Sequence, residues 1–265
     1  MLMKKQIKRF LRMTDERWFS SYFQMLRDLI TISKPILRKQ SLFSEASLHV
    51  NYVVVDNYFA VLCNKYGTDK GSLVQTNVSH PLEKQVHNYA DFYDLLFSGL
   101  RHQFRNIFEC GIGTTSEIIP SSMGKLGRPG ASLRVWRDYF PEAEIVGADI
   151  DYDCLFQDDR IRTFQVDQTD PISISKMWSL IGKLEFDLII DDGLHTFESG
   201  TTFFTHAIHH LKPGGFYVIE DVYLQDIEKY RSYFSQLDYR FSFVHLTRNS
   251  QPLIDNNLVL IRLKD

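Results

Sequence analysis

Two short acidic runs carry the side chains best suited to chemistry in this sequence. Asp191-Asp192-Gly193-Leu194-His195 follows one apolar segment, and Glu220-Asp221 follows the next. Carboxylates gathered in one place repel one another, and a hard divalent cation such as Mg²⁺ relieves that repulsion. His195, three residues beyond Asp192, is of the type that takes a proton from a hydroxyl group at such a cation. The pattern predicts a divalent-cation site beside a general base, whereas a structural explanation makes Asp191 a helix cap and His195 a loop residue.

A glycine pair closes an earlier apolar segment and indicates a ligand-binding turn. Gly111 and Gly113 let the backbone approach a ligand closely, and Glu109 can accept a hydrogen bond from an amine or a hydroxyl. A dinucleotide-binding turn needs a third glycine that runs directly into a helix. Here residues 114–117 are Thr-Thr-Ser-Glu, which puts an acid where a phosphate would lie. The turn therefore disfavours NAD.

Acidic and amide side chains end the next two apolar segments. Asp149 can accept hydrogen bonds from the two hydroxyls of a ribose, and Asp167 with Gln168 could hold the amino edge of an adenine. Each acid alone could equally cap a helix. Their occurrence on successive segments after a Gly-x-Gly turn favours a nucleoside site.

An alternation of strands and helices from residue 88 onward must position these residues. We expect strands at 106–110, 144–149, 161–166, 186–190, 216–219, 239–246 and 258–263, and helices at 89–104, 132–140, 172–181, 196–211 and 225–237. Residues 212–215, Lys-Pro-Gly-Gly, predict a turn. The pattern indicates a doubly wound, seven-stranded, mostly parallel Rossmann-like sheet with helices on both faces and an antiparallel hairpin at one edge.

The chain changes character near residue 70. Before it, apolar residues recur at helical spacing over 18–32 and again over 53–62, where Gly67 should end the helix. We expect an N-terminal helical region at 1–70 and the α/β domain at 71–265. Residues 1–40 carry ten Lys or Arg and three Asp or Glu, a net charge of +7, so the rest carries −10 of the total of −3. We expect this basic segment to pack on its own domain or on a sister subunit of a homo-oligomer, or else to contact an acidic membrane surface or an acidic glycan.

Composition narrows the class of protein. The 265 residues are 44% hydrophobic and 24% charged, which permits one sizeable core, and a net charge of −3 gives no basic field for nucleic acid. Three dispersed cysteines argue against a disulfide framework and for a reducing compartment. No apolar run reaches the roughly 20 residues of a membrane span, and the N-terminus lacks the apolar core of a secretory signal. We expect a cytoplasmic location.

Five segments in this order and spacing resemble the macrocin- and mycinamicin-type sugar O-methyltransferases. They are residues 66–71, 108–113, 129–136, 191–195 and 211–221. The resemblance implies the class I S-adenosylmethionine-dependent methyltransferase sheet, whose closing hairpin separates it from a plain dinucleotide-binding sheet. Leu194 departs from the family, which commonly has a serine there, and residues 1–60 do not match.

The resemblance also assigns roles to the residues selected above. It implies Asp192, Glu220 and Asp221 as ligands of Mg²⁺ or Mn²⁺, and His195 as general base, with Asp192 counted as catalytic as well. It implies Glu109, Asp149 and Asp167 as contacts of S-adenosylmethionine. Together with Gly111, Gly113, Gln168 and Asp191, they make up the predicted cofactor-binding set.

The expected reaction is methyl transfer to a hydroxyl of a sugar or glycosylated acceptor, either a natural-product glycoside or a surface-polysaccharide precursor. One alternative is a metal-dependent methyltransferase for a small non-sugar hydroxylated metabolite or a phosphorylated sugar derivative. Another is a non-catalytic nucleoside-binding relative. The presence of His195 together with all the acidic residues favours an enzyme.

Overall fold

The computed structural model describes residues 57–71, 87–125, 127–247 and 253–263. These residues all belong to one compact unit, Tyr52–Asp265. The helix predicted over 18–32 and the basic segment 1–40 lie outside the described residues. Within the described ranges, no helix is long and apolar enough to cross a membrane.

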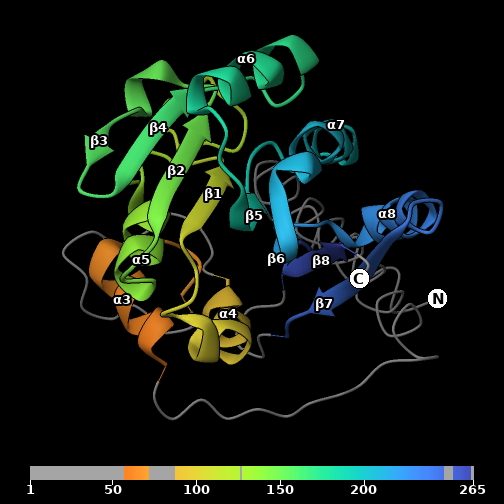
Figure 1. Ribbon diagram of the computed structural model, residues 1–265, viewed down its shortest axis with the longest axis horizontal. Helices are drawn as coiled ribbons and strands as arrows, with labels where there is room; N and C mark the ends of the chain where they lie inside the picture. Colours follow the sequence, from red (N-terminus) through yellow and green to blue (C-terminus); the bar gives the residue numbers. More distant parts are fainter. Residues whose placement is uncertain (1–56, 72–86, 126, 248–252, 264–265) are drawn as a thin grey trace, which may run out of the picture. The chain divides into compact units, whose positions relative to one another are not determined.

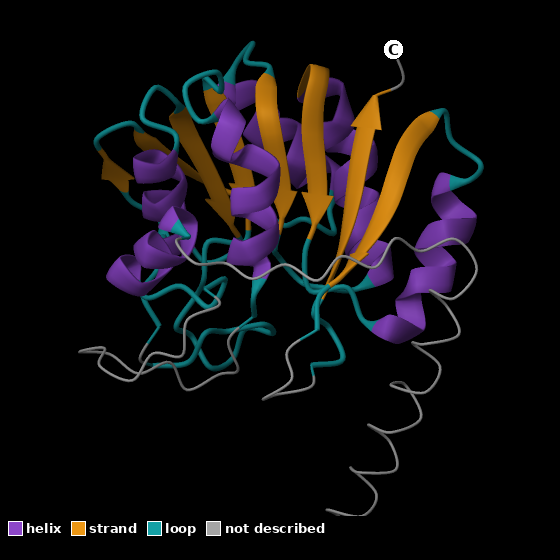
Figure 2. Ribbon diagram, turned by 90° about the horizontal axis from the view of Figure 1, so that it is seen from below, coloured by secondary structure: helices purple, strands orange, loops and turns teal. Residues whose placement is uncertain are grey.

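An eight-stranded sheet in the order β3-β4-β2-β1-β5-β6-β8-β7 forms the centre of the unit (Figure 1). The strands are β1 (Asn106–Cys110), β2 (Glu144–Asp149), β3 (Gln157–Asp158), β4 (Ile161–Gln165), β5 (Phe186–Asp191), β6 (Leu211–Ile219), β7 (Tyr239–His245) and β8 (Asn257–Leu263). Strands β4, β2, β1, β5 and β6 are mutually parallel, whereas β8 is antiparallel to both β6 and β7. Figure 2 shows the arrowheads of the parallel strands ending at one edge, where loops gather.

Helices cover both faces of the sheet (Figure 2). They are α3 (Tyr58–Tyr66), α4 (Tyr89–Phe97), α5 (Ala131–Tyr139), α6 (Pro171–Ile181), α7 (Phe197–Ala207) and α8 (Ile227–Phe234). Strand β1 shows how the faces divide: Ile107 joins the core that α3, α4 and α5 cover, while the ring of Phe108 stacks on Phe203 of α7 at 5.8 Å. Alternate residues of a strand point to opposite faces of the sheet. Because helices cover both faces, Ile107 and Phe108 are both buried.

Helix α3 packs in the same core as the sheet, although it precedes residue 70. Asn57 caps its start by accepting a hydrogen bond from the backbone N–H of Ala60, and Gly67 ends it with φ of 78°. The ring of Phe59 meets Trp136 of α5 edge-on at 4.8 Å. The end of this helix at Gly67 is confirmed, and a domain boundary at residue 70 stays a prediction.

Several elements differ from their predicted bounds, most of all α4, α7, α8 and β6. The helices expected over 89–104 and 196–211 are shorter, because α4 and α7 each end in a 3₁₀ turn, Ser98–Leu100 and Ile208–His210. The turn predicted over 212–215 is wrong, since β6 already starts at Leu211. Leu211 pairs with Phe186, and Phe216 pairs with Leu188. Residues 212–215 therefore form an irregularity within β6, opposite a single residue of β5. The eighth strand, beyond the seven expected, is the two-residue β3.

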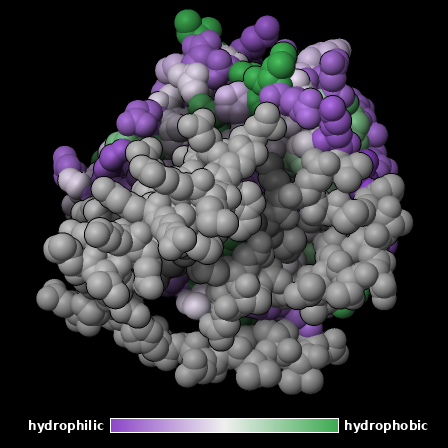
Figure 3. All heavy atoms as spheres, turned by 180° about the vertical axis from the view of Figure 1, so that it is seen from behind, coloured by the Kyte–Doolittle hydropathy of each residue, from purple (hydrophilic) through white to green (hydrophobic). Residues whose placement is uncertain are grey.

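The described residues are mainly hydrophilic on the face shown in Figure 3, and their three cysteines are buried. Hydrophilic side chains predominate among the coloured residues of the face in Figure 3, and hydrophobic ones are few there. Single exposed apolar residues are normal on a protein surface. Cys63, Cys110 and Cys154 are all buried and free.

Candidate active site

A cavity of about 610 Å³ lies at the carboxyl ends of the parallel strands. Its walls come from the residues that follow β1, β2, β4, β5 and β6, which is the place where open α/β sheets bind ligands. The predicted residues that line it are Gly111, Gly113, Asp149, Asp167, Gln168, Asp192, His195 and Asp221. Glu109, Asp191 and Glu220 are buried and do not line it.

The glycine turn after β1 has the open backbone that was expected of it. Gly111 and Gly113 have φ of 85° and 87°, a region that favours glycine. The carboxylate of Asp149 accepts hydrogen bonds from the backbone N–H of Ile112 at 2.9 Å and of Asp151 at 3.0 Å. Asp149 therefore fastens the turn to the end of β2 while it also faces the cavity.

Gln168 joins the loop after β4 to the loop after β5. Its Nε2 donates to Oδ1 of Asp191 at 2.9 Å, and its Oε1 accepts from the backbone N–H of Leu194 at 2.6 Å. Burial raises the pKa of Asp191 to about 6, although the bond from Gln168 acts against this. Asp167 is half-buried and accepts hydrogen bonds from Thr169, as a turn-forming Asp does. Asp191 and Gln168 therefore connect the loops after β4 and β5, and Asp191 does so behind the cavity wall.

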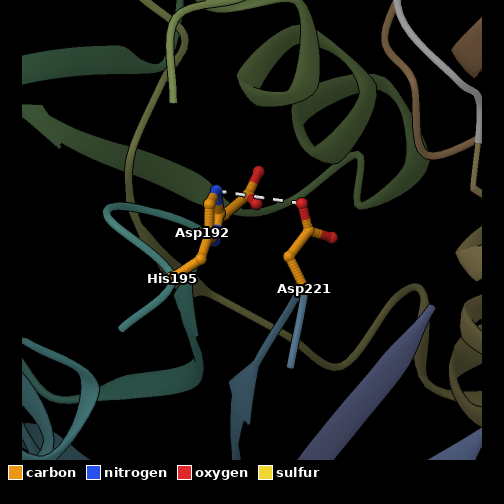
Figure 4. Close-up of side chains that lie close together, drawn as sticks. All are labelled: Asp192, His195 and Asp221. Atoms are coloured by element: carbon orange, nitrogen blue, oxygen red, sulfur yellow. Dashed lines mark ion pairs between the residues drawn. The ribbon is translucent and has the colours of Figure 1, made fainter. Parts of the chain in front are cut away.

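Asp192, His195 and Asp221 all line the cavity and converge on one another (Figure 4). One ligand atom from each lies within 4.8 Å of the others, and Nε2 of His195 is 3.8 Å from Oδ2 of Asp221. His195 and Asp221 have φ of 60° and 51°. Such values are uncommon outside glycine, and strained backbone of this kind gathers at functional sites.

Asp221 is surrounded by groups that favour its charged form. Burial acts to raise its pKa, but the charges of His87 and His195 and the hydrogen bond from Tyr89 outweigh burial, so the pKa is lowered. Oη of Tyr89 donates to Oδ1 of Asp221 at 2.7 Å, and Nε2 of His87 lies 3.5 Å from the same oxygen. The pKa of Asp192 is raised, mainly by burial.

Lys70 lies behind this group, in contact with three carboxylates. Its Nζ is 2.5 Å from Oδ2 of Asp192 and 3.4 Å from Oε1 of Glu109, and it donates to Oε2 of Glu220. Tyr93 donates to the other oxygen of Glu220. Burial acts to lower the pKa of Lys70, but the three carboxylates raise it well above its usual range, so the ammonium stays charged.

The structure therefore divides the predicted metal ligands. Asp192 and Asp221 face the cavity with His195, whereas Glu220 is buried and engaged by Lys70 and Tyr93. Sequence reasoning assigned no role to Lys70, Tyr89, Tyr93 or His87. The available signal for Lys70 was its place in residues 66–71, the first of the five segments of the family resemblance.

The chain is similar in sequence to known O-methyltransferases. No family model matches the chain. It is 31% identical over 157 residues to the 8-demethyl-8-alpha-L-rhamnosyl tetracenomycin-C 2'-O-methyltransferase of Streptomyces olivaceus. It is 35% identical over 138 residues to the mycinamicin VI 2''-O-methyltransferase of Micromonospora griseorubida, and 37% over 139 residues to the L-olivosyl-oleandolide 3-O-methyltransferase of Streptomyces antibioticus. These matches cover 52–59% of this chain but only 32–39% of each relative.

A solved structure has the same fold. The MycE methyltransferase from the mycinamycin biosynthetic pathway, in complex with Mg, SAH and mycinamycin VI, matches with a TM-score of 0.52 and 25% identity. The match covers 77% of this chain and 54% of MycE. The sheet of this chain is therefore that of a class I S-adenosylmethionine-dependent methyltransferase, and its sequence is related to the macrocin- and mycinamicin-type O-methyltransferases.

Proposed function

We propose that this chain is a metal-dependent O-methyltransferase that transfers a methyl group from S-adenosylmethionine to a hydroxyl of a sugar or glycosylated acceptor. One observation carries the proposal. Asp192, His195 and Asp221 converge within 4.8 Å in the cavity that also contains the glycine turn and Asp149. A cation-binding group, a base and a nucleoside-binding strand end thus share one site.

The cavity fits S-adenosylmethionine as methyl donor. Its volume of about 610 Å³ is within the range of small-molecule sites. Gly111 and Gly113 leave the backbone bare at the end of β1, where a ligand's amino-acid portion could approach, and Asp149 stands at the end of β2 for ribose hydroxyls. Ile150 and Val166 line the cavity and supply an apolar surface for an adenine ring.

The part of the cavity that Asp192 and Asp221 line fits a hard divalent cation. Asp192 and Asp221 offer carboxylate oxygens, and the remaining positions suit water or the oxygens of an acceptor. A bound Mg²⁺ or Mn²⁺ would supply Lewis acidity, which lowers the pKa of a hydroxyl at the site. Glu220 stays a predicted ligand that would have to exchange its contact with Lys70 for the metal.

His195 is the proposed general base. In the reaction the acceptor oxygen forms a bond to the methyl carbon, the carbon–sulfur bond breaks, and its electron pair stays on sulfur. The hydroxyl proton goes to the imidazole of His195, whose Nε2 lies 3.8 Å from Oδ2 of Asp221. Cavity walls that hold donor and acceptor in line contribute the rest of the rate enhancement.

A sugar-bearing acceptor is proposed from the relatives. Their names specify a rhamnosyl tetracenomycin and an olivosyl-oleandolide, and MycE was solved with mycinamycin VI. Tyr223, Leu253 and Asp255 also line the cavity, so it presents both apolar and polar side chains. Such a lining suits the mixed surface of a glycoside. A homo-oligomer, a cytoplasmic location and membrane contact through 1–40 stay predictions.

The test is a methyl-transfer assay on the purified full chain. S-adenosylmethionine is supplied with glycosides, their sugar-free aglycones, sugar phosphates and catechols, and mass spectrometry detects a gain of one methyl group. We expect transfer to glycosides, loss of transfer with EDTA and recovery with Mg²⁺ or Mn²⁺. Transfer to catechols or sugar phosphates alone would refute the acceptor, and transfer that is indifferent to EDTA would refute the metal.

A further inference from the structure

The most buried cation near the proposed site is Lys70, with only 2% of its surface exposed. A buried ammonium costs several kcal/mol of desolvation unless carboxylates and hydrogen bonds compensate it. Lys70 has three such partners, Glu109, Asp192 and Glu220, and they come from the ends of three neighbouring strands, β1, β5 and β6. One ammonium therefore ties together three strand ends whose carboxylates would otherwise repel one another.

The backbone holds Lys70 in this place. Its carbonyl oxygen accepts from the N–H of Ala90 at 2.8 Å, and the carbonyl of Asp69 accepts from the N–H of His87 at the same distance. Gly71 packs so closely on Cys63 that a Cβ there would lie 2.9 Å from the Cβ of Cys63. The segment is thus fastened to the start of α4 and to Cys63 of α3, so little backbone freedom is left at Lys70.

Asp192 contacts Lys70 and also belongs to the proposed metal site. Its Oδ2 contacts Lys70, while the same carboxylate is one of the three side chains that could hold a divalent cation with His195 and Asp221. A divalent cation held by Asp192 would lie close to the fixed positive charge of Lys70. The two cations would repel each other and would share one carboxylate, at a depth where screening by solvent is weak.

We infer that Lys70 is a positioning residue, a built-in counter-ion that holds Asp192 and Glu220 in place in the metal-free protein and competes with the divalent cation for them. This inference rests on the proposed metal site. It implies that Lys70 limits the affinity for metal in exchange for a site that stays assembled without metal.

The test compares Lys70→Met with Lys65→Met, which removes an exposed lysine that pairs with Asp138 at 2.9 Å. Calorimetry at pH 8 with Mn²⁺ alone measures affinity, and thermal unfolding in EDTA measures metal-free stability. We expect Lys70→Met to bind Mn²⁺ more tightly, by on the order of tenfold, and to melt well below the wild type without metal. Lys65→Met should change neither quantity appreciably.

A double variant, Lys70→Met/Glu220→Gln, keeps the inference testable if Lys70→Met does not fold. It removes one charge of each sign, so it should melt above Lys70→Met. Equal or weaker Mn²⁺ binding by Lys70→Met, or a double variant less stable than the single one, would overturn the inference. If the wild type binds no Mn²⁺, the proposed metal dependence fails. Thermal unfolding in EDTA then tests only whether Lys70 stabilises the metal-free protein.

Discussion

Gly111 packs directly against the backbone of Asp192. A Cβ at position 111 would lie 2.0 Å from the carbonyl oxygen of Asp192, and the N–H of Asp192 donates to the carbonyl of Cys110 at 2.8 Å. The turn proposed for the methyl donor and the first proposed metal ligand are therefore parts of one backbone contact between β1 and β5. A change on one side of this contact must disturb the other.

Gly111→Ala should impair both proposed binding functions at once. The substitution places a methyl group against backbone and strains a residue whose φ is 85°, each of which costs on the order of 1–3 kcal/mol. We expect lower stability in denaturant and weaker binding of both S-adenosylhomocysteine and Mn²⁺ by calorimetry. Gly214→Ala is the control, because its φ is 78° and nothing lies within 4 Å of the added Cβ. If the two variants lose equal stability, the close contact with Asp192 has no energetic weight.

His195→Ala should separate catalysis from binding. A positioned general base usually contributes about 10²–10⁴-fold to turnover, so we expect a loss of that size with S-adenosylhomocysteine and metal affinities near those of the wild type. Asp192→Asn should instead lower metal affinity, and excess metal should partly restore its turnover. A large loss of Mn²⁺ affinity in His195→Ala would make His195 a ligand rather than the base.

Asp191 should make the protein less stable as the pH rises from about 4 to 6. Its pKa is raised from 3.8 to about 6 by burial, so over this range the folded protein retains a proton that the unfolded chain releases. Stability from this group is then complete below pH 4 and falls by up to about 3 kcal/mol by pH 6. Asp191→Asn stays neutral, so its stability relative to the wild type should increase across this window. Denaturant unfolding at several pH values measures the difference, and a difference independent of pH would contradict the prediction.

Leu194→Ser should alter recognition of the acceptor and leave the rest of the site intact. Leu194 lines the cavity, and its bond to Gln168 uses the backbone N–H, which the variant keeps. We expect unchanged stability and S-adenosylhomocysteine binding, with a KM for the acceptor changed several-fold in methyl-transfer assays. An unchanged KM over a panel of glycosides would show that this side chain does not contact the acceptor.

The sequence determined where the sheet and its ligand-binding edge lie. Strands β1 and β2 have the predicted bounds, and the others differ by few residues except β6, because buried strands are short apolar runs that glycine and acidic residues end. Asp192, His195 and Asp221 follow neighbouring parallel strands, so their convergence was predictable from strand order alone. Spacing along the chain carries this information because Asp192 and His195 follow β5 closely and Asp221 follows β6 closely.

The tertiary structure decided which carboxylates face the cavity and which are occupied from behind. Glu109 and Glu220 end buried strands just as Asp149 does, yet they meet Lys70 instead of the cavity. Lys70 and Glu220 are 150 residues apart. Their contact depends on how α3 and α4 pack against the sheet, and no local pattern of residue types encodes that packing, because the hydrophobic effect that drives it is not directional.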